Sequence, residues 1–146
     1  MIHHGACHCG GIAVTLDTPR DPARQVLGRC QCSFCRKHNA RTFSDPGSQL
    51  AVRVEDAACL NRYAFGLRTA EQVLCARCGV YVAMILSDGS RHWSVLNVDT
   101  LDDRAAFPHP GNARDYDAET VADRIARRKA RWTPTRVQGW TPSPHP

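Results

Sequence analysis

The sequence predicts a mainly β fold of short antiparallel strands, held together by bound metal and followed by a C-terminal helix and an extended tail. Short apolar runs alternate with turns that contain Gly, Pro, Asp and Ser, which is typical of a β domain. Most cysteines form tight clusters, and helical periodicity is confined to the C-terminal region. The chain has 146 residues, which suggests one domain with a real core.

Four segments in the first half of the chain have the pattern of short strands. Residues 11–17 alternate apolar with small or polar side chains, as a half-buried strand does. Residues 33–38 have room for one turn of helix, with Ser33 placed to cap it. The expected strands cover residues 11–17, 25–29, 50–54 and 60–65.

A β-hairpin is predicted in the second half. Residues 80–86 are strongly apolar, and residues 87–90 read Ser-Asp-Gly-Ser, which is typical of a hairpin turn. Residues 92–98 would then pair back onto residues 80–86. We expect this hairpin to end the β-rich part, with a domain boundary after residue 106.

Residues 107–146 are expected to form a linker, a basic helix and a proline-rich tail that is extended or frayed. Asp117 can cap a helix that runs to about Arg131, with Val121 and Ile125 on its apolar face. Trp132 could extend that face. The opposite face carries arginines, which we interpret as solvated, with a phosphate or partner site as the alternative. These arginines are Arg124, Arg127, Arg128 and Arg131.

Seven of the eight cysteines have the close spacing of metal ligands. No apolar run approaches the roughly eighteen residues of a membrane span, and the N-terminus lacks the apolar core of a signal peptide. We therefore expect a cytoplasmic protein with no membrane partner. Thiols stay reduced in the cytosol, so clustered cysteines there indicate metal ligands instead of disulfides.

Two zinc ions per chain account for the seven clustered cysteines. Zinc takes four ligands in structural sites, and three ligands plus an open position in catalytic sites. The first pair and the last pair would form the structural site, because Gly10 and Gly79 allow the positive φ that a zinc-binding turn requires. Its ligands are Cys7, Cys9, Cys75 and Cys78.

Cys30, Cys32 and Cys35 form the second proposed site, which leaves one zinc position open to water or to a thiol. The identity of a fourth ligand stays open, because either Cys59 or His38 could close the site. A single cysteine between Ala58 and Leu60 is more often a buried apolar residue, which favours the open, catalytic site.

Four motifs occur in a specific order across about residues 2–101: Gly5-Ala6-Cys7-His8-Cys9-Gly10-Gly11, Cys30-x-Cys32-Ser33-x-Cys35-Arg36-Lys37, Tyr63-x-Phe65-Gly66 and Cys75-x-x-Cys78-Gly79. They resemble the glutathione-dependent formaldehyde-activating enzyme family, which also includes centromere-protein-V-like proteins. The resemblance implies a β-tent fold with two zinc sites that use the cysteines as divided above. It also implies a carbon–sulfur lyase that joins the thiol of glutathione to formaldehyde, giving S-hydroxymethylglutathione.

Residues just after the third ligand are expected to line the substrate site. We name His38, Asn39 and Arg41 as candidate substrate-binding residues. Basic residues beside the cluster could pair with the carboxylates of a peptide-like thiol. These are Arg29, Arg36, Lys37 and Arg41. No pattern marks a general base, so zinc-bound water or His38 could serve, and the substrate could be another thiol or aldehyde adduct.

A zinc-stabilised binding module for nucleic acid or a protein partner is the alternative function. The formal net charge of +5 favours an acidic partner. However, residues 111–146 supply much of that charge, aromatic residues make up only 7% of the chain, and no basic stripe is evident outside residues 124–131. We therefore do not expect nucleic acid as the partner, and we make no prediction of oligomeric state.

Overall fold

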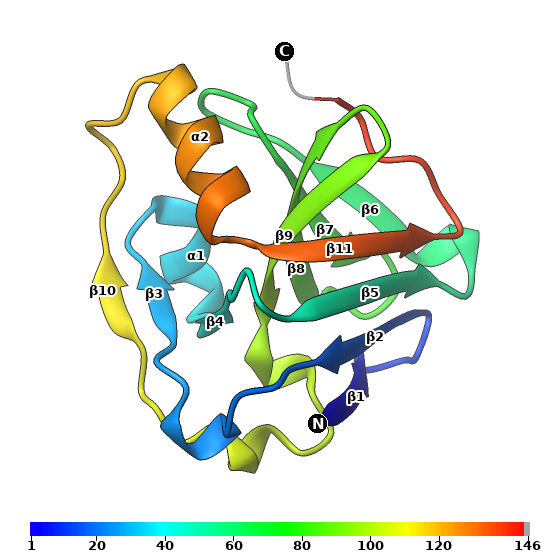
Figure 1. Ribbon diagram of the computed structural model, residues 1–146. Helices are drawn as coiled ribbons and strands as arrows, with labels where there is room; N and C mark the ends of the chain where they lie inside the picture. Colours follow the sequence, from blue (N-terminus) through cyan, green and yellow to red (C-terminus); the bar gives the residue numbers. More distant parts are fainter. Residues whose placement is uncertain (145–146) are drawn as a thin grey trace.

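Eleven strands and two α-helices make up the computed structural model, which describes residues 1–144 (Figure 1). The strands are β1 (Ile2–Ala6), β2 (Ile12–Asp17), β3 (Gly28–Cys30), β4 (Thr42–Phe43), β5 (Gln49–Val54), β6 (Leu60–Tyr63), β7 (Glu71–Cys75), β8 (Tyr81–Asp88), β9 (Arg91–Asn97), β10 (Asn112–Arg114) and β11 (Thr133–Gln138). The helices are α1 (Ser33–His38) and α2 (Val121–Arg131). The predicted mainly β fold is confirmed.

All of these strands belong to one sheet that branches at β9. One arm runs in the order β1-β2-β5-β11-β9-β4-β3-β10, and the other joins β9 through β8, β7 and β6. One edge of β9 is shared, because β11 pairs with residues 92–94 and β4 with residues 96–97. The other edge pairs with β8. Figure 1 shows α1 and α2 together on the side where β3 and β10 run.

Most predicted strands appear close to their expected positions. Strands β2, β5 and β6 correspond to three of the four segments expected in the first half, and β8 and β9 form the predicted hairpin. The expected strand at residues 25–29 is displaced: a 3-10 helix covers Pro22–Arg24, Gln25 is its C-cap, and β3 starts only at Gly28. Strands β1, β4, β7 and β10 were not predicted.

The C-terminal tail contains an unexpected strand inside the sheet. Strand β11 pairs in parallel with β5 and antiparallel with β9, so it joins two strands of the preceding part of the chain. Thr133 at its start is buried, and its hydroxyl accepts a hydrogen bond from the Asp45 amide at 3.0 Å. The expected boundary after residue 106 stays a prediction, but the segment beyond it completes the sheet.

Helix α2 begins later than the sequence suggested. Its N-cap is Thr120, whose hydroxyl accepts from the Asp123 amide at 3.1 Å, and not Asp117. Ile125 and Trp132 pack against Met84, Leu86 and Trp93 of the β8–β9 hairpin. Neither α1 nor α2 has the length and apolar character of a membrane-spanning helix.

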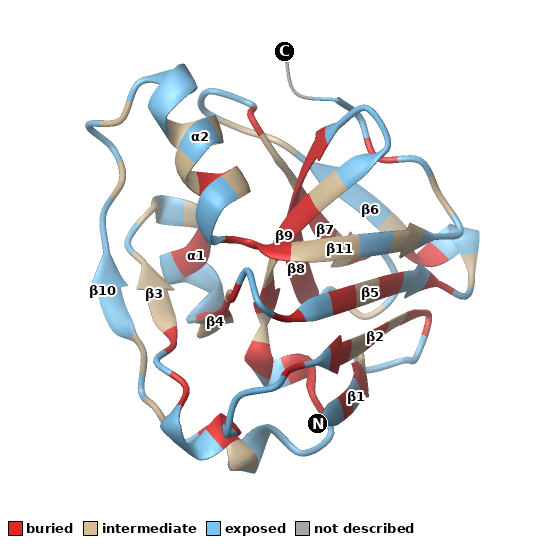
Figure 2. Ribbon diagram, viewed as in Figure 1, coloured by how far each residue is buried: buried red, intermediate tan, exposed pale blue. Residues whose placement is uncertain are grey.

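The main core lies between the two arms of the sheet. Alternate residues of β2 and β5 are buried, whereas β8 is buried along most of its length (Figure 2). Both faces of β8 are covered, because Ala83 and Ile85 belong to the main core and Met84 and Leu86 to a second cluster with Trp132. Cys7, Cys59 and Cys75 belong to this core. One group of cysteines is therefore built into the centre of the fold.

Candidate metal centres and the cavity beside them

The structure brings the seven clustered cysteines together in the two groups that the sequence analysis proposed. The sulfur atoms of Cys7, Cys9, Cys75 and Cys78 all lie within 4.8 Å of one another. The same holds for Cys30, Cys32 and Cys35. Both donor sets are soft thiolates at a spacing that suits zinc. We call them the four-cysteine group and the three-cysteine group.

The four-cysteine group joins two turns that are distant in sequence. The turn after β1 supplies Cys7 and Cys9, the end of β7 supplies Cys75, and the turn after β7 supplies Cys78. Backbone amides point at the sulfurs: Ile12 donates to Cys7 Sγ at 3.3 Å, and Cys78 donates to Cys75 Sγ at 3.5 Å. Amide hydrogen bonds favour the anionic form of a sulfur, and the four sulfurs equal in number the ligands of a structural zinc site.

Two glycines allow the turns of the four-cysteine group to bend. Gly10 and Gly79 have φ angles of 83° and 78°, in the left-handed region that glycine tolerates best. The pKa values of the thiols in this group differ. The Gly11 amide lowers the pKa of Cys9 to about 6, whereas burial raises the pKa of Cys7 to about 12. A bound cation would offset the cost of making the buried sulfurs anionic.

The three-cysteine group is built from one short segment. Cys30 ends β3, Cys32 is the N-cap of α1 and Cys35 is buried inside α1. The expected cap, Ser33, is instead the first helical residue, because Cys32 Sγ accepts from the Cys35 amide at 3.4 Å. Hydrogen bonds from the Cys30 and Cys35 thiols lower the pKa of Cys32 to about 2, and the pKa of Cys35 is raised accordingly.

Neither alternative fourth ligand joins the three-cysteine group. Cys59 lies at the other site: it is fully buried in the core, beside Gly11 and next to Cys9 and Cys75. Its position therefore excludes Cys59 as a ligand of the three-cysteine group. The ring of His38 packs against Phe34 and Tyr81, with centroids 4.5 and 5.5 Å away, and no His38 nitrogen belongs to the group.

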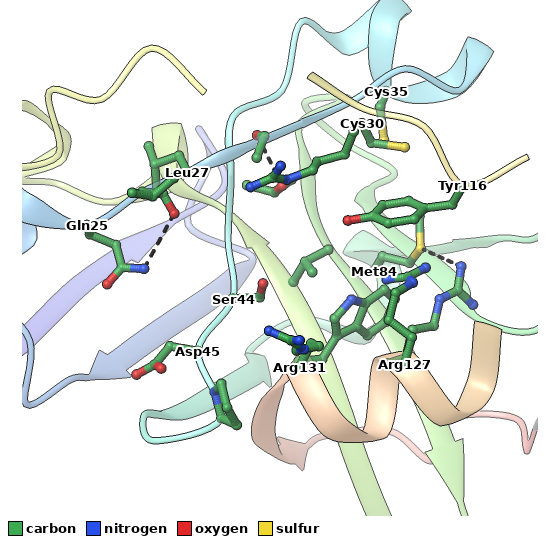
Figure 3. A pocket seen from close by; sticks show the side chains of 18 of the residues that line it. Gln25, Leu27, Cys30, Cys35, Ser44, Asp45, Met84, Tyr116, Arg127 and Arg131 are labelled. Carbon is green, nitrogen blue, oxygen red and sulfur yellow. Dashed lines mark hydrogen bonds between the residues drawn. The ribbon is translucent and has the colours of Figure 1, made fainter. Parts of the chain in front are cut away.

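A cavity of about 740 Å³ opens beside the three-cysteine group (Figure 3). Cys30 and Cys35 lie on one side of it, and Arg127 and Arg131 of α2 lie on the other. A second cavity of about 350 Å³ is lined by Cys30, Cys32 and the loop at residues 65–70. Arg127, Arg128 and Tyr116 line both. Cavities of this size accommodate a small-molecule substrate.

The arginine face of α2 is not the solvated surface that we expected. Arg128 is only 8% exposed, and its guanidinium donates to Thr69 Oγ1 at 2.6 Å and lies 4.7 Å from the Trp132 ring centroid. Arg127 pairs with Glu119 at 2.7 Å, and its guanidinium lies over the Tyr116 ring at 3.6 Å. The helix thus turns this face towards the cysteine cavity.

Sequence reasoning did not identify Tyr116, Arg127 or Arg128 as residues of the site. The available signal was the spacing of Arg124, Arg127, Arg128 and Arg131, which places four cations on one helix face. That spacing shows that a cationic face exists. It does not show whether the face meets solvent or another part of the chain, because this depends on the path of residues 107–120.

The predicted substrate-binding residues line neither cavity. Asn39 ends α1 in the left-handed conformation, with φ 50°, and its side-chain oxygen accepts from Arg29. Arg41 pairs with Asp99 at 2.5 Å and donates to the carbonyl of Phe107 at 2.8 Å. Contacts within the protein therefore engage both side chains. A role of His38, Asn39 and Arg41 in binding substrate stays a prediction.

Comparison with known proteins agrees with this geometry. The family model described as glutathione-dependent formaldehyde-activating enzyme matches residues 2–113, which include every residue of both cysteine groups. The chain belongs to this family. A crystal structure of a Rhodobacter sphaeroides protein is also similar, with 31% sequence identity and a TM-score of 0.51. The similarity covers 68% of this chain and 88% of that one. Helix α2 and strand β11 lie beyond the segment that the family model matches.

Proposed function

We propose that the protein is a zinc-dependent carbon–sulfur lyase that forms or breaks an adduct between a thiol and an aldehyde. Glutathione and formaldehyde are the first substrates to test, because the chain belongs to the formaldehyde-activating family. The observation that carries the proposal is that Cys30 and Cys35 of the three-cysteine group lie at the wall of a cavity of about 740 Å³. Cytosolic conditions fit this function because both cysteine groups must stay reduced.

Cys30, Cys32 and Cys35 would hold the catalytic zinc, and Cys7, Cys9, Cys75 and Cys78 the structural one. A zinc ion with an open position supplies charge that favours a thiolate and polarises a carbonyl oxygen. The protein fixes the donor geometry through β3 and the start of α1. The Cys35 amide adds a hydrogen bond that keeps Cys32 Sγ oriented.

The reaction needs control of one proton. A carbon–sulfur bond forms, the carbonyl π bond breaks, and the thiol proton ends on the former carbonyl oxygen. The hydroxyl of Tyr81 is buried next to the three-cysteine group and has no hydrogen-bond partner among residues 1–144. Tyr81 lines neither cavity, so we assign this hydroxyl no contact with the substrate, and we propose that the proton reaches the former carbonyl oxygen through water in the cavity.

The alternative function, a binding module for nucleic acid, gains little from the arginines of α2. Arg127 and Arg124 pair with Glu119 at 2.7 and 3.7 Å, and Arg128 is buried. An electrostatic binder needs cations that are free to replace counterions on phosphates. These three side chains are engaged within the protein.

The test follows the formation of S-hydroxymethylglutathione from ¹³C-formaldehyde by NMR, together with native mass spectrometry of the protein. We expect two zinc ions per chain and a rate above the spontaneous reaction. The acceleration should disappear in Cys32→Ser and persist in Cys59→Ser, since Cys59 belongs to neither group. A Cys32→Ser protein that accelerates the reaction like wild type would disprove the assignment.

A further inference from the structure

The cavity beside the three-cysteine group has a cationic wall that the proposed chemistry does not require. Helix α2 contributes Arg127, Arg128 and Arg131 to it, and Arg114 comes from the end of β10. Figure 3 shows Arg127 and Arg131 on the helix at one side of the cavity and Cys30 and Cys35 across from them. Formation of the carbon–sulfur bond needs no such wall, so the wall would serve another part of the substrate.

Arg128 is the unusual member of this wall. It is more than nine-tenths buried, yet its partners are neutral: Thr69 Oγ1, the Trp132 ring and the weak acceptor Met84 Sδ at 3.9 Å. Its Nε has no hydrogen-bond partner, and no carboxylate lies within 4.0 Å of it among residues 1–144. Burial of an unpaired charge is unfavourable, so such a group is normally matched by an anion.

Neighbouring arginines differ from Arg128 in this respect. Arg127 and Arg124 share Glu119, and Arg20 at the cavity rim lies 3.1 Å from Asp45. Burial and the other arginines lower the pKa of Arg128, but only to about 10, so it is cationic at neutral pH. Glu119 and Cys30 act on Arg128 electrostatically, but no carboxylate of residues 1–144 forms an ion pair with this buried charge.

We propose that Arg128 binds a carboxylate of the substrate, so that the enzyme acts on a carboxylate-bearing thiol or aldehyde. Arg131 and Arg114 add long-range charge at the same cavity. Arginine suits this task because its planar fork binds a carboxylate through two hydrogen bonds. The inference rests on the proposed function for its link to turnover, but the anion site itself is a binding property. Since α2 lies beyond residues 2–113, this specificity would come from outside the segment that the family model matches.

Two sources of the carboxylate are possible, and two probes distinguish them. S-methylglutathione keeps both carboxylates of glutathione but has no free thiol to bind zinc. Glyoxylate is an aldehyde that carries its own carboxylate. Each is titrated into the zinc-loaded, full-length protein by isothermal calorimetry, so that affinity is measured without turnover.

The variants are Arg128→Gln, the exposed rim variant Arg131→Gln, and Arg136→Gln as a matched control. Arg136 is an exposed arginine of β11 that lines neither cavity. For the probe that carries the recognised carboxylate, we expect affinity to fall about 10- to 100-fold in Arg128→Gln, the usual range for a hydrogen-bonded charge pair. Arg131→Gln should weaken binding about threefold and Arg136→Gln should not change it. If Arg128→Gln does not fold, Arg128→Lys takes its place, because lysine keeps the charge but not the planar fork; affinity should still fall, and unchanged affinity would overturn the inference.

The inference is overturned if neither probe binds wild type, or if all variants bind alike. Its failure is distinguishable from failure of the proposed function. A probe that binds through Arg128 without any acceleration of adduct formation would leave the anion site standing and remove the proposed reaction. Acceleration with formaldehyde and cysteamine, which has no carboxylate, together with absent probe binding, would leave the reaction standing and remove the anion site.

Discussion

The two cysteine groups offer the same kind of donor atom, a cysteine sulfur, but occupy different places in the fold. The four-cysteine group ties the turn after β1 to the end of β7, and Cys7 and Cys75 belong to the main core. The three-cysteine group comes from residues 30–35 alone and faces a cavity. A metal in the first group closes a long loop of chain, whereas a metal in the second closes only a local one. The difference suggests that fold and chemistry depend on separate ions.

The largest effect is expected from Cys78→Ser. Structural zinc sites in small proteins contribute about 10–16 kcal/mol of apparent binding free energy, which matches or exceeds the usual total stability of about 5–15 kcal/mol. Removal of one of four ligands should therefore abolish soluble, folded protein. Circular dichroism and metal analysis of the purified chain provide the measurement.

Cys59→Ser is the matched control for that variant, because it removes a cysteine from the same neighbourhood. Cys59 is buried beside the four-cysteine group but is not a member of it. We expect two zinc ions per chain and a modest loss of stability from the buried hydroxyl. The comparison between the groups breaks down if Cys59→Ser loses an ion or if Cys78→Ser stays folded with two.

A smaller structural effect is expected from Cys32→Ser. The protein should remain folded with one zinc ion, because the remaining ligands come from a local segment and serine is itself a good N-cap for α1. Cys32→Ala removes the ligand and the cap together and should cost about 1 kcal/mol more. Thermal unfolding separates the two variants, and zinc content should show the loss of one ion in both. Aggregation of Cys32→Ser would mean that both groups are structural.

Much of the candidate site could be predicted from cysteine spacing alone. Ligands within one turn of chain are constrained locally, and the counts of two, three and two divide naturally into four and three. The glycines after Cys9 and Cys78 could also be explained in advance, since both adopt positive φ. The position of Cys59 was harder to predict from the sequence, because it depends on tertiary packing against Gly11.

The C-terminal part could not be predicted in the same way. Asp117 and Thr120 are both residues that favour an N-cap, and only Thr120 has Asp123 placed to complete a reciprocal pair of hydrogen bonds. Tertiary structure alone determines that Arg128 is buried and that β11 lies between β5 and β9. Neither leaves a periodic signal in the sequence, and the prolines around β11 favour a loop.

The smallest effect is expected from Gly11→Ala, which probes the packing around the four-cysteine group without removing a ligand. A Cβ on Gly11 would lie 2.2 Å from Cys59 Sγ and 3.6 Å from Cys9 Sγ, so the core must shift next to the metal ligands. We expect unfolding to become easier by about 1–3 kcal/mol, as for overpacked cores. A chelator should also remove one of the two zinc ions faster than from wild type. Gly10→Ala is the control: its Cβ meets nothing within 4 Å, so only the cost of its positive φ, about 1 kcal/mol, applies. Equal chelation rates in wild type and Gly11→Ala would show that packing against Cys59 does not hold the four-cysteine group in place, and that its ligand turns alone do so.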